Sequence, residues 1–207
     1  MQRPLVCVVE DDASLRQALC QALALLDADI RAFAGAGALL QDREALGRVA
    51  CLVLKVGLRG IGGLDLQDSL RSLGVSAAVV FLSGPCDVTV AVRALRGGAL
   101  DFMLLPVDVG ALRKRVAEGI ARAARADARR SRLQTVSELL ARLTAREREV
   151  LDGVVRGDSN AEVARSLGIS TKTVEQHRAR VMTKMRVASL AALVARVTEW
   201  RVLSGTD

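Results

Sequence analysis

Short apolar runs alternate with amphipathic segments along the first half of the chain. We interpret the apolar runs as five buried strands, at residues 5–9, 30–33, 51–54, 77–82 and 99–104. The segments between them are predicted as helices, at residues 13–26, 36–46, up to 72, 87–96 and from about 108. Strands that alternate with helices predict an α/β domain whose parallel sheet is covered on both faces.

Polar residues follow several of these strands directly. Glu10, Asp11 and Asp12 come after the first strand, Lys55 after the third and Ser83 after the fourth. In an open parallel sheet, sites lie at the carboxyl ends of the strands. We therefore expect a polar pocket at this edge of the sheet.

The last 65 residues have a helical period instead. Thr144 and Glu147 form a capping-box pattern at the start of one helix. A short helix over residues 160–167 ends at Gly168, where glycine permits a left-handed turn. Ser170 is a good N-cap for a third helix, and residues 189–201 form a fourth amphipathic segment. Two helices joined by a tight glycine turn make a helix-turn-helix.

The helix after Ser170 has one apolar and one polar face. Val174, His177, Val181 and Met185 lie three and four residues apart and share the apolar face. The rest of the surface is polar and mostly basic, which suits a DNA major groove. A solvated face of an ordinary amphipathic helix explains the same pattern when this helix is taken alone.

This part of the chain resembles the four-helix DNA-binding domain of the LuxR/FixJ/NarL family. The resemblance is carried by LTAREREVL (143–151), NAEVARSLGIS (160–170), TKTVEQHRARVMTKM (171–185) and SLAALV (189–194). It implies that the third helix enters the major groove and that the fourth helps the domain to dimerise.

The resemblance also implies roles for individual residues. Glu175, Gln176 and Ala179 match positions that face base edges, where Gln176 can read adenine and Glu175 can accept from cytosine. Arg178 is a candidate for a base or a phosphate, and His177 is expected to pack beneath the helix. We expect phosphate contacts, which set register without reading sequence, from Lys172, Thr173, Arg180 and Lys184.

Residues 4–122 resemble the receiver domain of two-component response regulators, particularly of the FixJ type. The motifs are VVEDD (8–12), CLVLKVGLRGIGGLDLQ (51–67), VVFLSG (79–84) and DVTVAVRALRGGALDFMLLP (87–106). The resemblance implies a flavodoxin-like (βα)5 fold. It matches Glu10 and Asp11 to a Mg²⁺-binding pair, Ser83 to the switch hydroxyl and Phe102 to the switch aromatic residue. Leu105-Pro106 takes the place of a peptide bond that is often cis.

Two positions depart from the receiver pattern. Lys55 stands where the family has the phosphoacceptor aspartate, and Leu105 stands where it has a lysine. An ammonium forms no acyl phosphate and is a poor neighbour for Mg²⁺, so we expect Mg²⁺ binding to be weak or lost, with no other cofactor or metal. Our hypothesis is that Lys55 pairs with Glu10 and Asp11 and locks the pocket, because crowded carboxylates otherwise raise each other's pKa. The alternative is evolutionary drift, in which the site has lost its function and Lys55 points to solvent.

The connection between the two segments is predicted to be helical. Apolar positions recur from Val109 onward, and no proline or glycine interrupts residues 120–143. The expected organisation is a receiver-like domain at residues 1–122, a helical linker at 123–140 and the DNA-binding domain at 141–207. A flexible charged linker around residues 125–132 is the alternative.

Charge and composition narrow the class of protein. Residues 113–132 hold 8 basic and 2 acidic residues, a net charge of +6 that either attracts phosphates or is an ordinary solvated face. Four cysteines without a CxxC pair, and one histidine, make a metal site improbable; Cys86 in a loop is a candidate redox-sensitive thiol. No run is apolar enough to span a bilayer and residues 1–9 lack a signal pattern, so we expect a cytoplasmic protein.

These observations together predict a transcription regulator rather than an enzyme. It is expected to bind double-stranded DNA as a homodimer, independently of aspartyl phosphorylation, with a partner protein or ligand at the receiver as one input. The alternative is a protein-interaction module whose DNA contacts are secondary.

Overall fold

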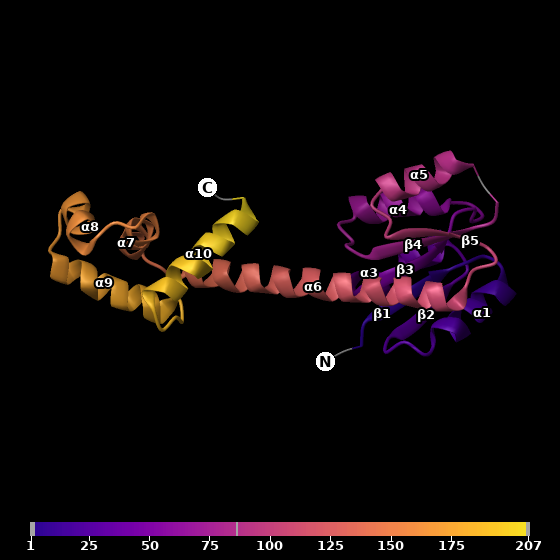
Figure 1. Cartoon of the computed structure of the whole chain (residues 1–207), viewed down its shortest axis with the longest axis horizontal. Coiled ribbons are helices and arrows are strands. Elements are labelled where there is room, and N and C mark those ends of the chain that lie inside the picture. Colours follow the sequence, from indigo (N-terminus) through magenta and orange to yellow (C-terminus); the bar gives the residue numbers. More distant parts are fainter. Residues whose placement is uncertain (1–2, 86, 206–207) are drawn as a thin grey trace. The chain divides into compact units, whose positions relative to one another are not determined.

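A five-stranded parallel sheet organises the first half of the molecule (Figure 1). The computed structural model describes residues 3–85 and 87–205, so Cys86 lies outside the described residues. The sheet has the order β2-β1-β3-β4-β5, which confirms the predicted α/β class with a parallel, flavodoxin-like sheet. Its strands are β1 (Leu5–Val9), β2 (Asp29–Phe33), β3 (Val49–Lys55), β4 (Ala78–Ser83) and β5 (Asp101–Leu104).

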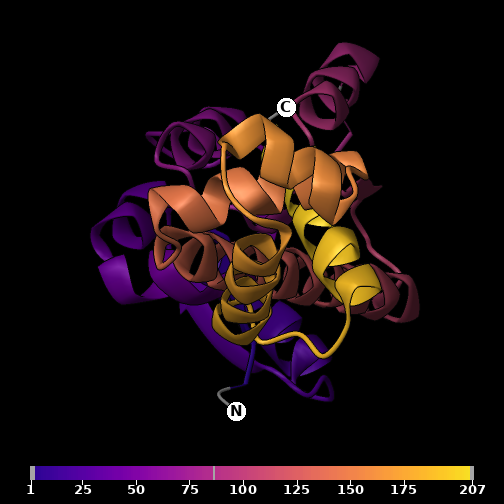
Figure 2. The same cartoon turned by 90° about the vertical axis from the view of Figure 1, so that its left-hand side faces the viewer.

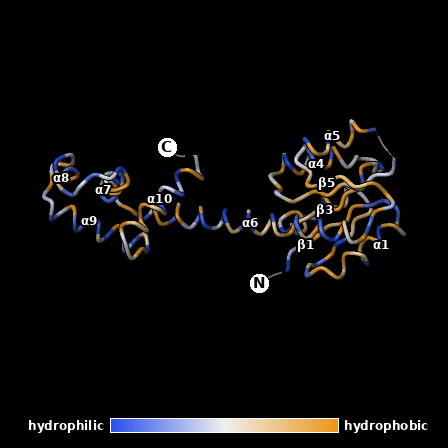
Figure 3. Tube along the Cα trace, in the orientation of Figure 1, coloured by the Kyte–Doolittle hydropathy of each residue, from blue (hydrophilic) through white to orange (hydrophobic). Residues whose placement is uncertain are grey.

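Helices cover both faces of this sheet, and this explains why β1, β3 and β4 are almost wholly apolar. One face packs against α1 (Ala13–Leu23) and the beginning of α6 (Val109–Ala141), through Leu19, Leu23, Leu112 and Val116. The other face packs against α2 (Ala36–Gln41), α3 (Arg43–Arg48), α4 (Gly63–Ser72) and α5 (Val88–Arg96). The hydrophobic colour of the central strands is visible in Figure 3.

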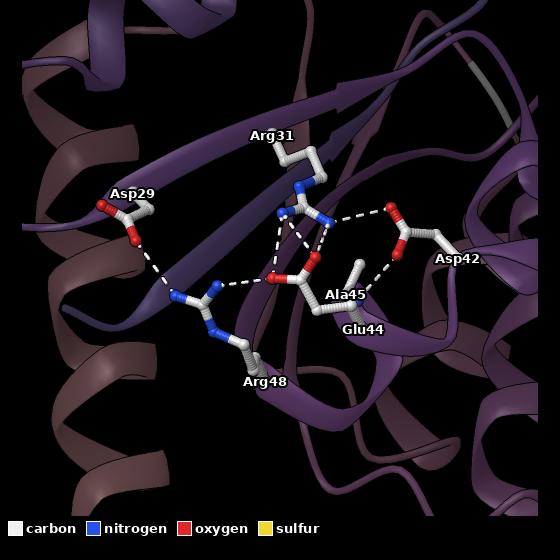
Figure 4. A network of polar contacts seen from close by, with 6 residues as sticks. All are labelled: Asp29, Arg31, Asp42, Glu44, Ala45 and Arg48. Atoms are coloured by element: carbon white, nitrogen blue, oxygen red, sulfur yellow. Dashed lines mark hydrogen bonds and ion pairs between the residues drawn. The ribbon is translucent and has the colours of Figure 1, made fainter. Parts of the chain in front are cut away.

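The segment at residues 36–46, predicted as one helix, is two helices, and the prediction was wrong there. Asp42 ends α2 and caps α3, because its side chain accepts a hydrogen bond from the Ala45 amide at 2.9 Å. Asp42 also pairs with Arg31 of β2 at 2.9 Å. Arg31 and Arg48 share the carboxylate of Glu44, and Arg48 reaches Asp29 at 3.1 Å (Figure 4). The break is therefore fixed by contacts with a neighbouring strand, which local periodicity does not contain.

Helix α6 is continuous from Val109 to Ala141. The chain divides into two compact units at residues 126 and 127, so this helix contributes to both. Its first part packs on the sheet through Leu112 and Val116. Its last part packs in the second unit through Val136 and Leu139.

The second unit contains helices and no strand among its described residues (Figure 2). Besides the end of α6 it contains α7 (Ala145–Arg156), α8 (Asn160–Leu167), α9 (Thr171–Lys184) and α10 (Leu190–Ser204). The predicted start and stop signals are confirmed. Thr144 and Glu147 form a capping box, Ser170 caps α9, and Gly168 takes a left-handed conformation with φ +65.

The cysteines that the structure describes are free thiols. Burial raises the pKa of Cys7 and of Cys51 to about 12, so these two thiols stay protonated as small core residues. Cys20 is half-buried. As for membranes, none of the helices in residues 3–85 and 87–205 has the length and apolarity needed to cross one.

Candidate functional site

The two central strands bring the predicted pocket residues together. β1 and β3 are parallel neighbours whose last registered pair is Val9 and Leu54. The next residues along each strand are Glu10 and Lys55, so these two stand side by side at the carboxyl edge. In a sheet of order 2-1-3-4-5 the strand order reverses between β1 and β3. Folds of this kind place their ligands at that point.

Lys55 bridges the two carboxylates at this edge. Its Nζ donates to Glu10 Oε1 at 2.8 Å and to Asp11 Oδ1 at 2.9 Å. The Glu10 side chain is 1% exposed, that of Asp11 13% and that of Lys55 27%. The ammonium thus lies between two acidic groups that are largely withdrawn from water.

The protonation behaviour of the pair follows from these contacts. The hydrogen bond from Lys55 lowers the pKa of Asp11 below its usual value. Hydrogen bonds to Glu10 and then Asp11 raise the pKa of Lys55. Lys55 and Asp11 therefore favour each other's charged form.

The residues at this edge do not fit a divalent metal ion. Hard cations require several oxygen ligands, and the ammonium of Lys55 already occupies one oxygen of Glu10 and one of Asp11. Glu10 Oε2 is buried and has no hydrogen-bond partner in the described structure, and a single orphaned oxygen does not make a coordination site. Within the described ranges no group of three or more acidic, histidine or cysteine side chains is placed to hold a metal.

The other predicted pocket residues have different roles. Asp12 turns away from the pair of Lys55 and its carboxylates, because Asp12 Oδ1 caps α1 by accepting from the Leu15 amide at 2.7 Å. Ser83 is buried at the end of β4. Phe102 is half-buried and packs against Phe81, with ring centroids 6.3 Å apart.

Leu105 belongs to the apolar core rather than to the pocket. It is partly buried and packs with the cluster between the sheet, α1 and α6. Its amide donates to the Ser83 carbonyl at 2.7 Å. The peptide bond between Leu105 and Pro106 is cis, as the receiver resemblance implies.

Two arginines that the sequence reasoning did not include also reach the acidic pair. Arg59 Nε lies 3.3 Å from Asp11 Oδ2, although the Arg59 side chain is 94% exposed. Arg16 of α1 donates to the Glu10 carbonyl at 2.7 Å. Arg16 falls four residues after Asp12, the N-cap of α1, and that spacing was a usable signal; the glycine-rich loop around Arg59 offered none.

Gly63 fixes the loop that follows Lys55. A Cβ atom at Gly63 would lie 2.2 Å from the Lys55 carbonyl oxygen, so only glycine permits this close approach. The Gly63 amide donates to the Val56 carbonyl at 2.8 Å. The first turn of α4 is thereby held against the end of β3.

In the second unit, α9 presents one buried and one exposed face. Val174 and Val181 are buried, and His177 is half-buried with its Nδ1 enclosed and without a partner in the described structure. The residues on the opposite face are exposed and recur three and four positions apart, namely Lys172, Glu175, Gln176, Ala179 and Arg180. These include Glu175, Gln176 and Ala179, the three residues for which the family resemblance implies contacts with base edges.

The remaining predicted DNA residues are engaged within the unit. Arg178 contacts Asn160 Oδ1 of α8. Thr173 shares a 2.8 Å hydrogen bond with the Ser170 hydroxyl. Lys184 Nζ lies 2.6 Å from Glu147 Oε2 and donates to the Arg142 carbonyl at 3.2 Å. These contacts position α9 on α7 and α8, and they leave Lys184 less free to meet a phosphate.

Glu147 is the buried acid that receives Lys184. It is 3% exposed, and its carboxylate also accepts from the Thr144 amide at 2.8 Å. The hydrogen bond from Lys184, followed by that from Thr144, lowers the pKa of Glu147 to about 2. One carboxylate therefore caps α7 and anchors the end of α9.

Comparison with known families divides the chain in the same way. Residues 6–117 match the response regulator receiver domain. Residues 141–197 match the family of bacterial regulatory proteins, luxR family. The two matches correspond to the sheet domain and to the helical unit.

Individual relatives match over nearly the whole chain. The transcriptional regulatory protein FixJ of Azorhizobium caulinodans is 38% identical, over 91% of this chain and 89% of its own length. The tetrathionate response regulatory protein TtrR of Salmonella typhimurium is 35% identical, over 91% and 89%. The solved structure of the response regulator StyR has a TM-score of 0.86 at 33% identity, covering 95% of this chain and 99% of its own.

Proposed function

The chain belongs to the response regulators that carry a LuxR-type DNA-binding domain, and from that premise we propose a transcription regulator whose receiver works without aspartyl phosphorylation. DNA binding and transcription regulation follow from the family. The observation that carries the rest is the contact of Lys55 Nζ with both Glu10 and Asp11.

The end of β3 lacks the acceptor of the usual chemistry. An acyl phosphate needs a carboxylate at the end of β3, and that residue is Lys55. The partner cation expected after β5 is replaced by Leu105, which packs in the core. Lys55 supplies the positive charge that Glu10 and Asp11 require, so the lock replaces both the metal ion and the phosphoryl group. The protein is thus a regulator rather than an enzyme.

The roles on α9 follow the exposed stripe. Glu175, Gln176 and Ala179 face the base edges, and Lys172 and Arg180 hold phosphates. Arg178 contacts Asn160 of α8, and Thr173 contacts Ser170 at the start of α9. We place these two residues, with Lys184, at the margin of the contact with the DNA backbone. We propose a homodimer on a two-fold symmetric site, as the family resemblance implies.

The input is then something other than phosphorylation. One candidate is the amount of protein in the cell. The other is a partner protein or a ligand on the receiver surface. The alternative function, a protein-interaction module with secondary DNA contacts, is favoured only by the altered receiver pocket.

The decisive experiment compares DNA affinity before and after treatment with acetyl phosphate and Mg²⁺. The full-length protein is titrated with fragments from its own upstream region, in a gel-shift or fluorescence assay. We expect sequence-specific binding by the untreated protein and the same Kd within about twofold after treatment. An increase in affinity on treatment would overturn phosphorylation independence, and absence of specific binding in both states would favour the interaction module.

A reconstructed receiver provides the matched control. The double substitution Lys55→Asp and Leu105→Lys restores both family residues at once. We expect this variant to take up a phosphoryl group and to bind Mg²⁺, while the unmodified protein does neither. Uptake by the unmodified protein would mean that another residue accepts the phosphoryl group.

A further inference from the structure

A hollow of about 540 Å³ lies in the second unit between the last turns of α6 and α10. Sites for small molecules typically measure about 300–1,000 Å³. Leu133, Val136 and Leu139 of α6 form one wall, and Trp200 and Leu203 of α10 form the other. Most of the lining side chains are apolar, so the hollow suits a hydrocarbon or aromatic body.

The charged residues of the hollow are unbalanced. Arg132, Arg186 and Arg196 line it together with one acid, Glu199. Arg132 is neutralised by Glu199 at 3.2 Å. Arg196 is half-buried and donates to the Met185 carbonyl at 2.7 Å, so its positive charge has no counter-ion there. The hollow therefore attracts an anion.

Arg186 is distinctive in its backbone and in its side chain. It is the one non-glycine residue at positive φ (52°) in the part of the chain that the structure describes. Glycine or asparagine adopts this conformation at lower cost than a long side chain does. The exposed guanidinium has no hydrogen bond or ion pair with any described residue. The backbone conformation has a local cause, because Arg186 follows the C-cap of α9 and its amide donates to the Thr183 carbonyl at 3.1 Å while the Val187 amide donates to the Met182 carbonyl at 3.1 Å. The side chain serves no internal contact, so its guanidinium is free to bind a ligand.

We propose that this hollow binds an amphipathic monocarboxylate, such as a medium-chain fatty acid or an aryl-substituted acid. The apolar body lies against Trp200 and Val136. The carboxylate is held by Arg186 and Arg196, since a guanidinium matches a carboxylate in a planar, two-point geometry. A nucleic-acid phosphate fits less well, because it has no apolar group that could pack against the apolar walls.

Binding is measured on the full-length protein with octanoate as the probe and octanol as its uncharged match. Trp200 is the only tryptophan in the chain, so its emission reports occupancy directly, and calorimetry gives the stoichiometry. We expect saturable binding of one octanoate per chain, with octanol at least about tenfold weaker. Non-saturable uptake, or equal affinity for octanol, would overturn the proposal.

Three variants locate the site. Arg186→Asn keeps a residue that tolerates positive φ but removes the guanidinium, and we expect affinity to fall at least about fivefold with an unchanged melting temperature. Ala195→Phe fills the hollow from α10 and should abolish binding. Arg129→Gln removes an exposed arginine of α6 outside the hollow and should bind as the unmodified protein does. Wild-type affinity in both of the first two variants would contradict the assignment.

A second copy of the chain is the competing occupant. If it covers the hollow, Trp200 emission shifts as protein concentration is raised without octanoate, and octanoate binding weakens in parallel. That result would assign the hollow to a dimer and reject the carboxylate site. Emission independent of protein concentration, together with saturable octanoate binding, is the result that we expect.

Discussion

Lys55 illustrates how one side chain sets the state of a pocket. Replacing Lys55 by Met keeps much of its length but leaves the buried Glu10 and Asp11 without their cation. Removing one member of a buried ion pair typically costs about 3–5 kcal/mol, and the partial exposure of Lys55 places the expected loss near the lower end. Urea unfolding at pH 7 measures it.

The control for this prediction is a second substitution at the other end of the pair. Glu10→Gln removes the buried charge, so the double variant with Lys55→Met should regain part of the lost stability. If the Lys55 side chain instead pointed to solvent, the two substitutions would show no coupling in unfolding free energy. A Lys55→Met variant with an unchanged unfolding free energy would therefore contradict the hypothesis that Lys55 locks the pocket.

Glu147 makes the stability of the second unit dependent on acid. Its pKa is about 2 in the folded state, against 4.5 ordinarily, so the carboxylate stabilises the fold fully above pH 4.5. This contribution is lost as pH falls from 4.5 through about 2, because the unfolded chain then binds the proton first. Glu147→Gln should lower the unfolding free energy by about 1–3 kcal/mol at pH 7.

The comparison of pH profiles checks this assignment. Thermal unfolding of the unmodified protein and of Glu147→Gln is followed between pH 7 and pH 2. The difference between the two should shrink as the pH drops. A difference that stays constant with pH would show that the carboxylate charge is not the stabilising feature.

At this scale the sequence predicted that Glu10, Asp11 and Lys55 meet at one sheet edge, as they do, but it did not specify the contacts of the other predicted residues. Glu10, Asp11 and Lys55 could be placed because strand ends converge at one sheet edge. Asp12 and Lys184 were grouped by position with the pocket and the DNA face, whereas their side chains meet Leu15 and Glu147. Such choices depend on side-chain geometry between distant elements, which spacing along the chain does not specify.

At the scale of elements, the exposed face of α9 is predicted to contain residues that read bases and residues that hold phosphates. Gln176→Ala removes an exposed amide from the centre of the stripe, and we expect it to change which base is preferred at one position of the site, by about 1–3 kcal/mol. Binding to a panel of single-base variants of the DNA site measures the change. An equal loss on every sequence would remove Gln176 from the set of base readers.

Lys172 provides the contrast on the same helix. Lys172→Ala removes an exposed charge near the start of α9, so it should weaken binding to all sequences alike. The slope of log K against log salt should become shallower by about 0.9, the value for one lost phosphate contact. A sequence-dependent loss would instead place Lys172 among the base readers.

Element boundaries were predictable where the end signals are local. The caps at Thr144 and Ser170 and the turn at Gly168 depend on neighbouring residues, and all three are present. The division at Asp42 combines a local cap on the Ala45 amide, which hydrophobic periodicity does not record, with a contact to Arg31 in another strand. Helix α6 lies between these cases. The absence of proline and glycine from residues 120–143 predicted a helix there, yet the charged residues at 125–132 also suited a flexible linker.

At the scale of the whole molecule, the two units have separate buried cores. The clusters around the sheet share no residue with those formed by α7 to α10 and the end of α6. Lys55 and Glu147 lie in different units, so the effects of Lys55→Met and Glu147→Gln on unfolding free energy should add within about 0.5 kcal/mol. Equilibrium unfolding of the two single variants and the double variant tests this, and strong coupling would show that the units fold as one.

The Lys55 contact also has a consequence in time. A bound ion exchanges with solution and a phosphoryl group is removed by hydrolysis. A site that depends on either one therefore returns to its resting state after the stimulus ends. Lys55 is covalently part of the chain and therefore cannot dissociate from it. A chelator, a phosphatase or a change of dilution leaves it in place. In the proposed lock the state lasts as long as the polypeptide, unless a partner protein or a ligand at the receiver displaces Lys55.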